Sequence, residues 1–129
     1  MSYATRQKEV LEAVFDRARR PLTPREIREE ARKEIPALGL ATVYRAIKRF
    51  VEEGRVRAVT VPGAGPRYER AGRSHHHFFL CGECKRLFDL IGCVPGLQAL
   101  APAGFRVRQH EIVLYGECGT CAGKAEARA

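Results

Sequence analysis

Two Cys-x-x-Cys pairs are the residues of this sequence best suited to chemistry. The pairs are Cys81 with Cys84 and Cys118 with Cys121. Two intervening residues allow a tight turn that points both thiolates at one ion, so two pairs can supply a tetrahedral four-cysteine shell for structural zinc. Disulfide bonds and a redox-active pair are the alternatives. The duplication of the pair, the glycine inside each copy and the expected lack of a secretion signal favour zinc in a reducing compartment.

Three consecutive histidines, His75, His76 and His77, precede the first cysteine pair. Alternate side chains of a strand share a face, so His75 and His77 can bind one ion together while His76 faces the other way. A surface histidine cluster is the alternative. Glu69 and Asp89 favour a metal, because Asp89 stands among apolar residues, where an unpaired carboxylate is costly and a cation would compensate it. A capping or salt-bridge role for Asp89 stays open.

Two further potential ligands, His110 and Cys93, lie outside these groups. His110 shares strand parity with Ile112 and Leu114, which is typical of a partly buried histidine, and a ligand role stays open. We interpret Cys93 as a small buried residue. No serine or cysteine stands in a recognisable nucleophile motif, and the sequence has no phosphate-binding glycine loop. We therefore expect a protein that is not an enzyme.

Three helices are predicted in the first half of the chain. Apolar residues recur at helical spacing over residues 5–19, with Thr5 as the expected N-cap. The sequence of residues 23–26, Thr-Pro-Arg-Glu, has the form of a capping box, so a second helix begins there and stops before Pro36. A third helix is expected over about 40–53 and ends at a glycine.

The third helix has two different faces. Its apolar stripe consists of Val43, Ile47, Phe50 and Val51, whereas its polar face carries Thr42, Tyr44, Arg45, Lys48 and Arg49. Such side chains reach phosphates and base edges when a helix lies in the major groove. A hairpin follows, with alternation over 55–61, a turn over 62–66 and a return strand over 67–69, and it contributes Arg57. This pattern predicts a winged helix-turn-helix; a solvated amphipathic helix is the alternative.

The second half is richer in short strands. We expect strands over 76–81 and 86–91 around the first cysteine pair, and a short helix over 94–101. A longer strand is expected from Phe105 to Tyr115, followed by the second pair and a frayed tail from Ala122 to Ala129. Residues 70–74 lack strong periodicity and are interpreted as a hinge between the two halves.

Size and charge limit the possibilities further. The chain has 129 residues and a net charge of +8, which favours a polyanionic partner. Cores of this size are marginal, so a bound metal or a dimer partner would help to stabilise the second half. No segment approaches the length of a membrane span. We expect no membrane association and a cytoplasmic location.

These segments together resemble the ferric uptake regulator family of metal-responsive repressors, whose branches include iron, zinc, manganese and peroxide sensors. The resemblance covers nearly the whole chain in family order. Its motifs are Thr5-Arg6-Gln7-Lys8, Ala41-Thr42-Val43-Tyr44-Arg45, Arg67-Tyr68-Glu69, the histidines before the first cysteine pair, Asp89, Gly104-Phe105-Arg106-Val107, and Leu114-Tyr115-Gly116 before the second pair.

The resemblance implies an α+β fold. An N-terminal winged helix-turn-helix domain over 1–69 binds DNA, a hinge covers 70–74, and a small C-terminal α/β dimerisation and metal-binding domain over 75–129 carries structural Zn2+ on the four cysteines. The resemblance also implies a regulatory site for a second divalent metal at the hinge, Fe2+, Mn2+ or Zn2+. The ligands expected for that site are Glu69, His75, His77 and Asp89, with His76 and His110 as further candidates.

Three departures from the family pattern stand out. Relatives often give the hinge metal a histidine just before the second helix, where this chain has Arg20-Pro21-Leu22. The histidine cluster is offset: counted forward from Glu69 the ligands are His75 and His77, whereas counted back from Cys81 they are His76 and a phenylalanine. Lys85 stands where a glycine usually follows the first pair.

The sequence therefore predicts a homodimeric, metal-dependent transcriptional regulator, a repressor of metal homeostasis or peroxide-response genes that binds palindromic double-stranded operators. Two other functions stay open. One is a small zinc-ribbon protein with thiol-redox activity, and the other is a nucleic-acid-binding protein that does not respond to metal.

Overall fold

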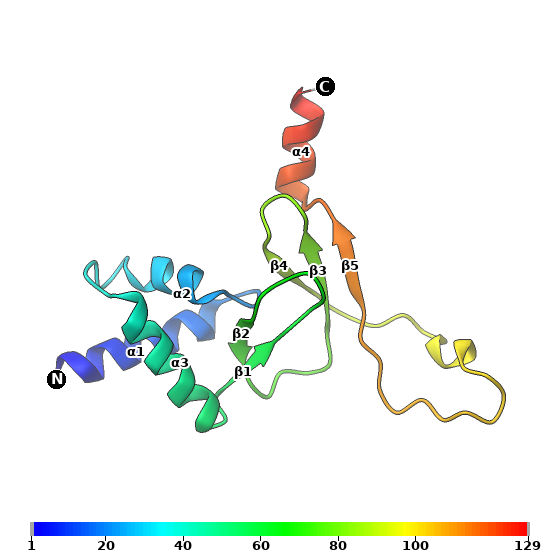
Figure 1. The fold of residues 1–129 in the computed structure, drawn as a ribbon, viewed down its shortest axis with the longest axis horizontal. Helices are drawn as coiled ribbons and strands as arrows, with labels where there is room; N and C mark the ends of the chain where they lie inside the picture. The colour runs from blue at the N-terminus through cyan, green and yellow to red at the C-terminus, as the bar shows by residue number, and fades with distance from the viewer. Residues whose placement is uncertain (1, 129) are drawn as a thin grey trace. The chain divides into compact units, whose positions relative to one another are not determined.

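The structure is a computed structural model and describes residues 2–128 of the chain. Its residues divide into two compact units, Met1–Arg73 and Ser74–Ala129 (Figure 1). The division falls within the segment 70–74, and the hinge function expected for that segment stays a prediction. None of the helices among the described residues is both long enough and apolar enough to cross a membrane.

The first unit contains three helices, α1 (Tyr3–Arg17), α2 (Pro24–Ala31) and α3 (Leu40–Glu52). Thr5 was expected to cap α1, but Ser2 does so, because its hydroxyl accepts the Thr5 backbone N–H at 3.1 Å. The predicted capping box of α2 is confirmed: Thr23 Oγ1 accepts the Glu26 N–H at 3.1 Å, and Thr23 N–H donates to Glu26 Oε1 at 2.9 Å. This α2 cap fixes the start of the second helix locally.

The apolar faces of the three helices meet in one core. Val43, Ile47 and Phe50 of α3 are buried, and the Phe50 ring lies edge-on against Phe15 of α1 at a centroid distance of 6.1 Å. Val51 was assigned to the same stripe but is 41% exposed. The next residue along a helix is rotated by about 100°, which carries Val51 off the buried face.

A two-stranded wing completes the first unit. Strands β1 (Val56–Val59) and β2 (Arg67–Arg70) pair antiparallel. Leu22 adds a bridge to Tyr68 through reciprocal backbone hydrogen bonds of 2.9 and 2.8 Å. The wing is therefore attached to the segment that precedes α2, and the unit has the winged helix-turn-helix architecture that the sequence predicted.

The second unit is built on a three-stranded sheet in the order β4-β3-β5. Its strands are β3 (His77–Cys81), β4 (Leu87–Leu90) and β5 (Val113–Gly116). The central strand β3 pairs antiparallel with β4 and parallel with β5. A single 3-10 turn (Leu97–Leu100) replaces the helix expected over 94–101.

Two expectations for the second unit were wrong. The long strand from Phe105 to Tyr115 is reduced to β5, because β3 offers partners only from Val113 onward and a strand without a partner is not stable. The tail expected to fray instead forms helix α4 (Gly119–Arg128). Its first turn begins at the second cysteine pair, where the Cys118 carbonyl accepts the Ala122 N–H at 2.8 Å.

The α2 cap generates a stability prediction. Thr23→Ala removes the hydroxyl that accepts the Glu26 N–H, so it should lower the free energy of unfolding by about 1 kcal/mol. The measurement is urea denaturation followed by far-ultraviolet circular dichroism. Thr60→Ala, the same change at an exposed position after β1, is the control and should change the midpoint little. Equal midpoints for the two variants would contradict the capping role.

Candidate metal centres and nucleic-acid interface

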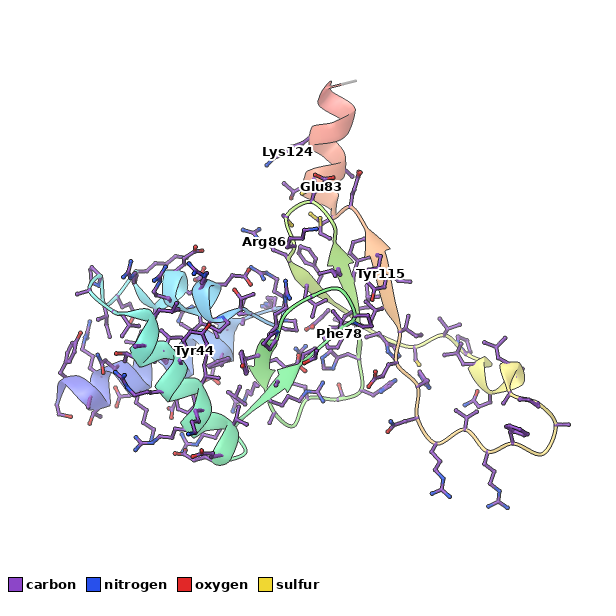
Figure 2. The ribbon with its side chains drawn as sticks, viewed as in Figure 1. Tyr44, Phe78, Glu83, Arg86, Tyr115 and Lys124 are labelled. Carbon is purple, nitrogen blue, oxygen red and sulfur yellow. The ribbon has the colours of Figure 1, made fainter. Side chains whose placement is uncertain are left out.

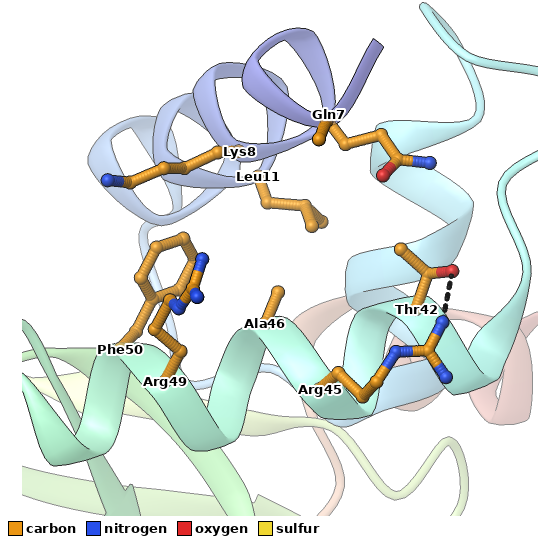
Figure 3. Close-up of a pocket in the computed structure, with 9 residues that line it drawn as sticks. Gln7, Lys8, Leu11, Thr42, Arg45, Ala46, Arg49 and Phe50 are labelled. Carbon is orange, nitrogen blue, oxygen red and sulfur yellow. Dashed lines mark hydrogen bonds between the residues drawn. The ribbon is translucent and has the colours of Figure 1, made fainter.

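Helix α3 presents its polar face to solvent. Tyr44, Arg45, Lys48 and Arg49 are all exposed, while the opposite stripe of the same helix is buried. The Arg45 guanidinium donates to Thr42 Oγ1 at 3.1 Å, which orients it along the helix surface (Figure 3). Tyr44 lies on the same helix (Figure 2). A helix of this kind has the dimensions and the donors needed to read a major groove.

Sequence reasoning missed a contribution of α1 to this face. A hollow of about 320 Å³ lies between α1 and α3, and its polar lining comes from Gln7 and Lys8 of α1 and from Thr42, Arg45 and Arg49 of α3 (Figure 3). Gln7 and Lys8 precede the buried Leu11 by four and three residues, so helical periodicity places them on its side of α1. Helical periodicity in the sequence could therefore have shown that these two residues lie beside α3.

Glu69 on the wing is held by two arginines. Its carboxylate lies 2.6 Å from an Arg57 Nη atom and 3.1 Å from an Arg73 Nη atom, and the residue is only 3% exposed. The register of the wing explains the first pair, since Arg57 and Glu69 are directly opposite. Arg57 was expected to contact DNA and Glu69 to bind metal; both roles stay predictions.

Arg20, at the place where relatives often carry a histidine, belongs to the α2 cap. Its guanidinium lies 2.6 Å from Glu26 Oε2. Burial alone would raise the pKa of Glu26, but the Thr23 N–H and the Arg20 charge outweigh it and hold that pKa below its ordinary value. A guanidinium stays protonated and cannot bind a cation, so Arg20 stabilises the helix start and supplies no metal ligand.

The four paired cysteines converge on one point of the second unit. Their sulfur atoms, from Cys81, Cys84, Cys118 and Cys121, all lie within 4.8 Å of one another, and Cys84 Sγ is 3.9 Å from Cys118 Sγ. All four are free thiols. Zinc–sulfur bonds of about 2.3 Å in a tetrahedron place neighbouring sulfurs about 3.8 Å apart. The cluster therefore fits a closed tetrahedral ion and not a pair of disulfides.

Backbone donors prepare this cluster for a cation. The N–H groups of Cys118 and Cys84 point at Cys81 Sγ, at 3.3 and 3.5 Å, and lower the pKa of Cys81 to about 6. Hydrogen bonding to Cys118 and burial raise the pKa of Cys121 to about 12. One thiolate is thus stabilised by the turn itself, whereas the full set of four needs the positive charge of a metal.

Lys85 ends the first cysteine turn in the left-handed conformation, with φ of 62°. Glycine adopts this conformation without the steric cost that a side chain brings. The glycine usual in relatives at this place therefore has a conformational reason, and this chain accepts some strain there.

A second group of ligands gathers at the opposite end of the same sheet. It consists of His75, His77, Cys93 and His110, whose potential ligand atoms also lie within 4.8 Å of one another. His110 Nε2 is 2.7 Å from Cys93 Sγ and 3.2 Å from His75 Nε2. Cys93 is exposed, so its interpretation as a small buried residue was wrong. The spacing of the sequence gave no sign that it would join the histidines.

His76 lies apart from the other histidines, and its Nε2 is 3.8 Å from Asp89 Oδ1. The register of the sheet explains this contact, because Asp89 is opposite Phe78 and shares with His76 the face of β3 that His75 and His77 do not use. Within the second unit, the structure therefore groups Asp89 with His76 and not with His75 and His77. The assignment of ligands to a regulatory ion stays a prediction.

The His77 ring is the only buried histidine of the cluster and is held by two contacts. Its Nδ1 accepts the Ile112 N–H at 3.1 Å, and its Nε2 lies 3.3 Å from Cys93 Sγ. Burial, together with the charges that His75 and His110 can carry, lowers the pKa of His77. Each of these effects disfavours the protonated ring.

A winged helix-turn-helix with an exposed cationic helix, joined in one chain to two metal-ligand clusters, defines a metal-linked DNA-binding transcription factor. The sequence model of the ferric uptake regulator family matches residues 2–115. The chain belongs to this family, whose members are metal-dependent transcriptional regulators.

Individual relatives agree with this assignment. The ferric uptake regulation protein of Campylobacter jejuni is 32% identical over 122 residues, which are 91% of this chain and 78% of the relative. The peroxide operon regulator of Bacillus subtilis is 31% identical over 96 residues, 70% of this chain and 64% of the relative. A zinc-bound manganese uptake regulator shares the fold with a TM-score of 0.76 at 22% identity, covering 92% of this chain and 89% of that one.

Proposed function

We propose that this protein is a metal-dependent transcriptional repressor that binds a palindromic operator as a homodimer and controls genes of metal homeostasis or of the peroxide response. The observation that carries the proposal is the division of α3 into a buried apolar face of Val43, Ile47 and Phe50 and an exposed face with three cations. A helix fixed by one face and basic on the other is suited to insertion into a major groove.

The polar side chains of α3 fall into two groups according to their position along the helix. Thr42, Tyr44 and Arg45 lie toward the N-terminal half of the helix, which is the part that contacts base edges in helix-turn-helix proteins. Lys48 and Arg49 lie toward its end and suit phosphates, as does Lys8 of α1 beside Arg49 in the hollow between the two helices. In this proposal the first group specifies sequence and the second supplies affinity.

Exposed apolar side chains support the homodimer. Of the large apolar residues that are exposed in the described part of the chain, most belong to the second unit: Ile91, Val94, Leu100, Phe105, Val107, Leu114 and Tyr115. Ile91 is 96% exposed and Leu100 82%. Apolar surface of this extent is characteristic of association, and a second copy of the unit would cover it. Tyr115 on β5 is marked in Figure 2.

Two metals enter the proposal with different roles. Structural Zn2+ on Cys81, Cys84, Cys118 and Cys121 would hold the second unit together, and a second divalent ion, Fe2+, Mn2+ or Zn2+, would regulate DNA binding. The histidines and Asp89 of the second unit are the proposed ligands of the regulatory ion. Glu69 stays a further predicted ligand; to bind, its carboxylate must exchange the guanidinium groups of Arg57 and Arg73 for the ion.

Replacing Arg45 and Lys48 separately should distinguish base contacts from phosphate contacts. Arg45→Ala should cost about 1–3 kcal/mol on a palindromic site selected from random DNA and should relax its sequence preference. Lys48→Ala should weaken binding to all sequences alike and reduce the salt dependence. Lys124→Ala in α4 (Figure 2) removes the same charge elsewhere and is the control. Operator affinity unchanged in both α3 variants would show that α3 does not bind DNA.

The zinc proposal predicts one ion per chain that survives purification and mild chelation. Cys118→Ser should lose it and leave the second unit poorly folded and the protein mostly monomeric, because binding and folding are linked. Metal content and light scattering are the measurements. Cys93→Ser changes a cysteine outside the four-sulfur cluster, so it should keep this ion and the dimer. A Cys118→Ser protein with unchanged zinc content and unchanged mass would refute the structural role.

Regulation by the second metal is tested by operator affinity at fixed salt, with Fe2+, Mn2+, Zn2+ or a chelator. The ion that serves as effector should tighten wild-type binding about 10-fold or more, within the usual range of allosteric coupling. His75→Ala combined with Asp89→Ala alters both histidine groups and should abolish the response. Gln109→Ala, an exposed neighbour of His110, should respond like wild type. Equal affinity with and without metal in the wild type would mean that the protein binds DNA constitutively.

A further inference from the structure

We propose that Cys93 is a metal ligand and that its thiolate, together with His75 and His110, forms a nitrogen–sulfur site that selects zinc(II) over oxygen-preferring ions such as manganese(II). In this refinement His77, one of the histidines proposed above as a ligand, supports the thiolate as a hydrogen-bond donor instead. The inference rests on the proposed function only in that this ion would be the second, exchangeable metal of the regulator. The geometry of the ligands stands by itself.

The topology of the sheet brings these residues together from three separate segments. His75 comes just before β3, Cys93 follows β4, and His110 precedes β5. Because β4 is antiparallel to β3, its last residues lie beside the first residues of β3, as the pairing of His77 with Leu90 shows. Because β5 is parallel to β3, its first residues lie there too. The three ligands therefore meet at the end of the sheet where β3 begins.

The distances suit a small tetrahedral ion. His75 Nε2 and His110 Nε2 are 3.2 Å apart, and Cys93 Sγ lies 3.7 Å from the first and 2.7 Å from the second. Zinc bonds of about 2.0–2.1 Å to nitrogen and about 2.3 Å to sulfur give separations of about 3.3–3.6 Å between ligand atoms in a tetrahedron. Only the Cys93–His110 contact must lengthen, and both residues lie in loops that can adjust.

The hydrogen bonds of His77 assign it a different role. Its Nδ1 accepts the Ile112 N–H, so in the neutral ring the hydrogen is on Nε2. That Nε2–H is 3.3 Å from Cys93 Sγ, where it can donate to a thiolate but has no lone pair for an ion. Outer hydrogen-bond partners of this kind orient a ligand and tune the metal. His77 is also buried, which fixes the donor in place.

The donor set determines the metal preference. Within the described residues no carboxylate belongs to this group, so the site offers imidazole and thiolate only. Manganese(II) prefers carboxylate and water oxygens, whereas thiolate and imidazole together suit zinc and its spectroscopic substitute cobalt(II). A metal-free alternative exists, in which Cys93 and His110 form a reactive thiolate–imidazolium pair. The convergence of a second imidazole on the same sulfur favours the ion.

The test titrates cobalt(II) into the full-length protein after removal of exchangeable metal, with zinc retained by the four-cysteine cluster. Wild type should bind one equivalent and show a thiolate-to-cobalt charge-transfer band together with the visible bands of a tetrahedral ion. Cys93→Ser should lose the charge-transfer band and more affinity than the roughly 10–100-fold that removal of an outer partner costs. Zinc(II) should displace the cobalt, and manganese(II) should not.

Substitution of the histidines separates ligands from the donor. His75→Ala and His110→Ala should prevent cobalt binding, whereas His77→Gln, which keeps an N–H donor, should bind one equivalent with the band retained. Bound metal should also protect Cys93 from alkylation, as measured by peptide mass spectrometry. A His77→Gln variant as defective as His75→Ala would overturn the donor role, and a band insensitive to Cys93→Ser would overturn the thiolate ligand. Rapid alkylation of Cys93 unaffected by metal would favour the reactive pair.

Operator binding measured on the same variants keeps this inference distinct from the proposed function. If metal tightens operator binding in Cys93→Ser as it does in wild type, and no band depends on Cys93, the thiolate site is wrong while the regulator stands. If the band depends on Cys93 but no DNA sequence is bound with or without metal, the thiolate site stands and the proposed function fails.

Discussion

The pairing of the central strand β3 with a different neighbour on each edge is the constraint on which the second unit depends. Strand β4 is antiparallel and β5 is parallel to β3. The start of β3 therefore lies beside the end of β4 and the start of β5, and the end of β3 lies beside the start of β4 and the end of β5. The four cysteines collect where β3 ends, and the imidazoles and the remaining thiol collect where it begins. A sheet with three antiparallel strands would have left Cys118 and Cys121 at the wrong end.

This sheet has little apolar core of its own. Among the described residues, the buried apolar side chains of the second unit are only Leu80, Cys81 and Leu87, whereas the first unit buries a continuous cluster from three helices and the wing. A core that small does not offset the entropy of ordering the chain. A bound ion and a partner surface would therefore stabilise the second unit, while the first unit has the core of an independently stable domain.

Local signals could be predicted from the sequence, whereas features that depend on distant pairing could not. The α2 cap, the buried stripe of α3 and the cysteine turns each follow from a few neighbouring residues, and the structure contains all three. The strand expected from Phe105 was too long, because its extent is set by β3. The position of Cys93 beside the histidines and the partner of Asp89 depend on the same registers. Periodicity shows which residues share a face but not which residue on another strand they meet.

The two clusters offer different ligand atoms, and this difference predicts which of them would bind a metal ion first. The four cysteines, one of them already stabilised as a thiolate by backbone N–H groups that lower the pKa of Cys81 to about 6, would make a closed and strongly binding shell for the proposed zinc ion. The histidine end offers a single cysteine and lies partly at the surface, so it would bind the same ion less tightly and exchange it more readily. Because both ends share β3, the first ion would order the strand whose start carries the second site. If both proposals hold, the protein would fold around one zinc ion and respond to the concentration of another.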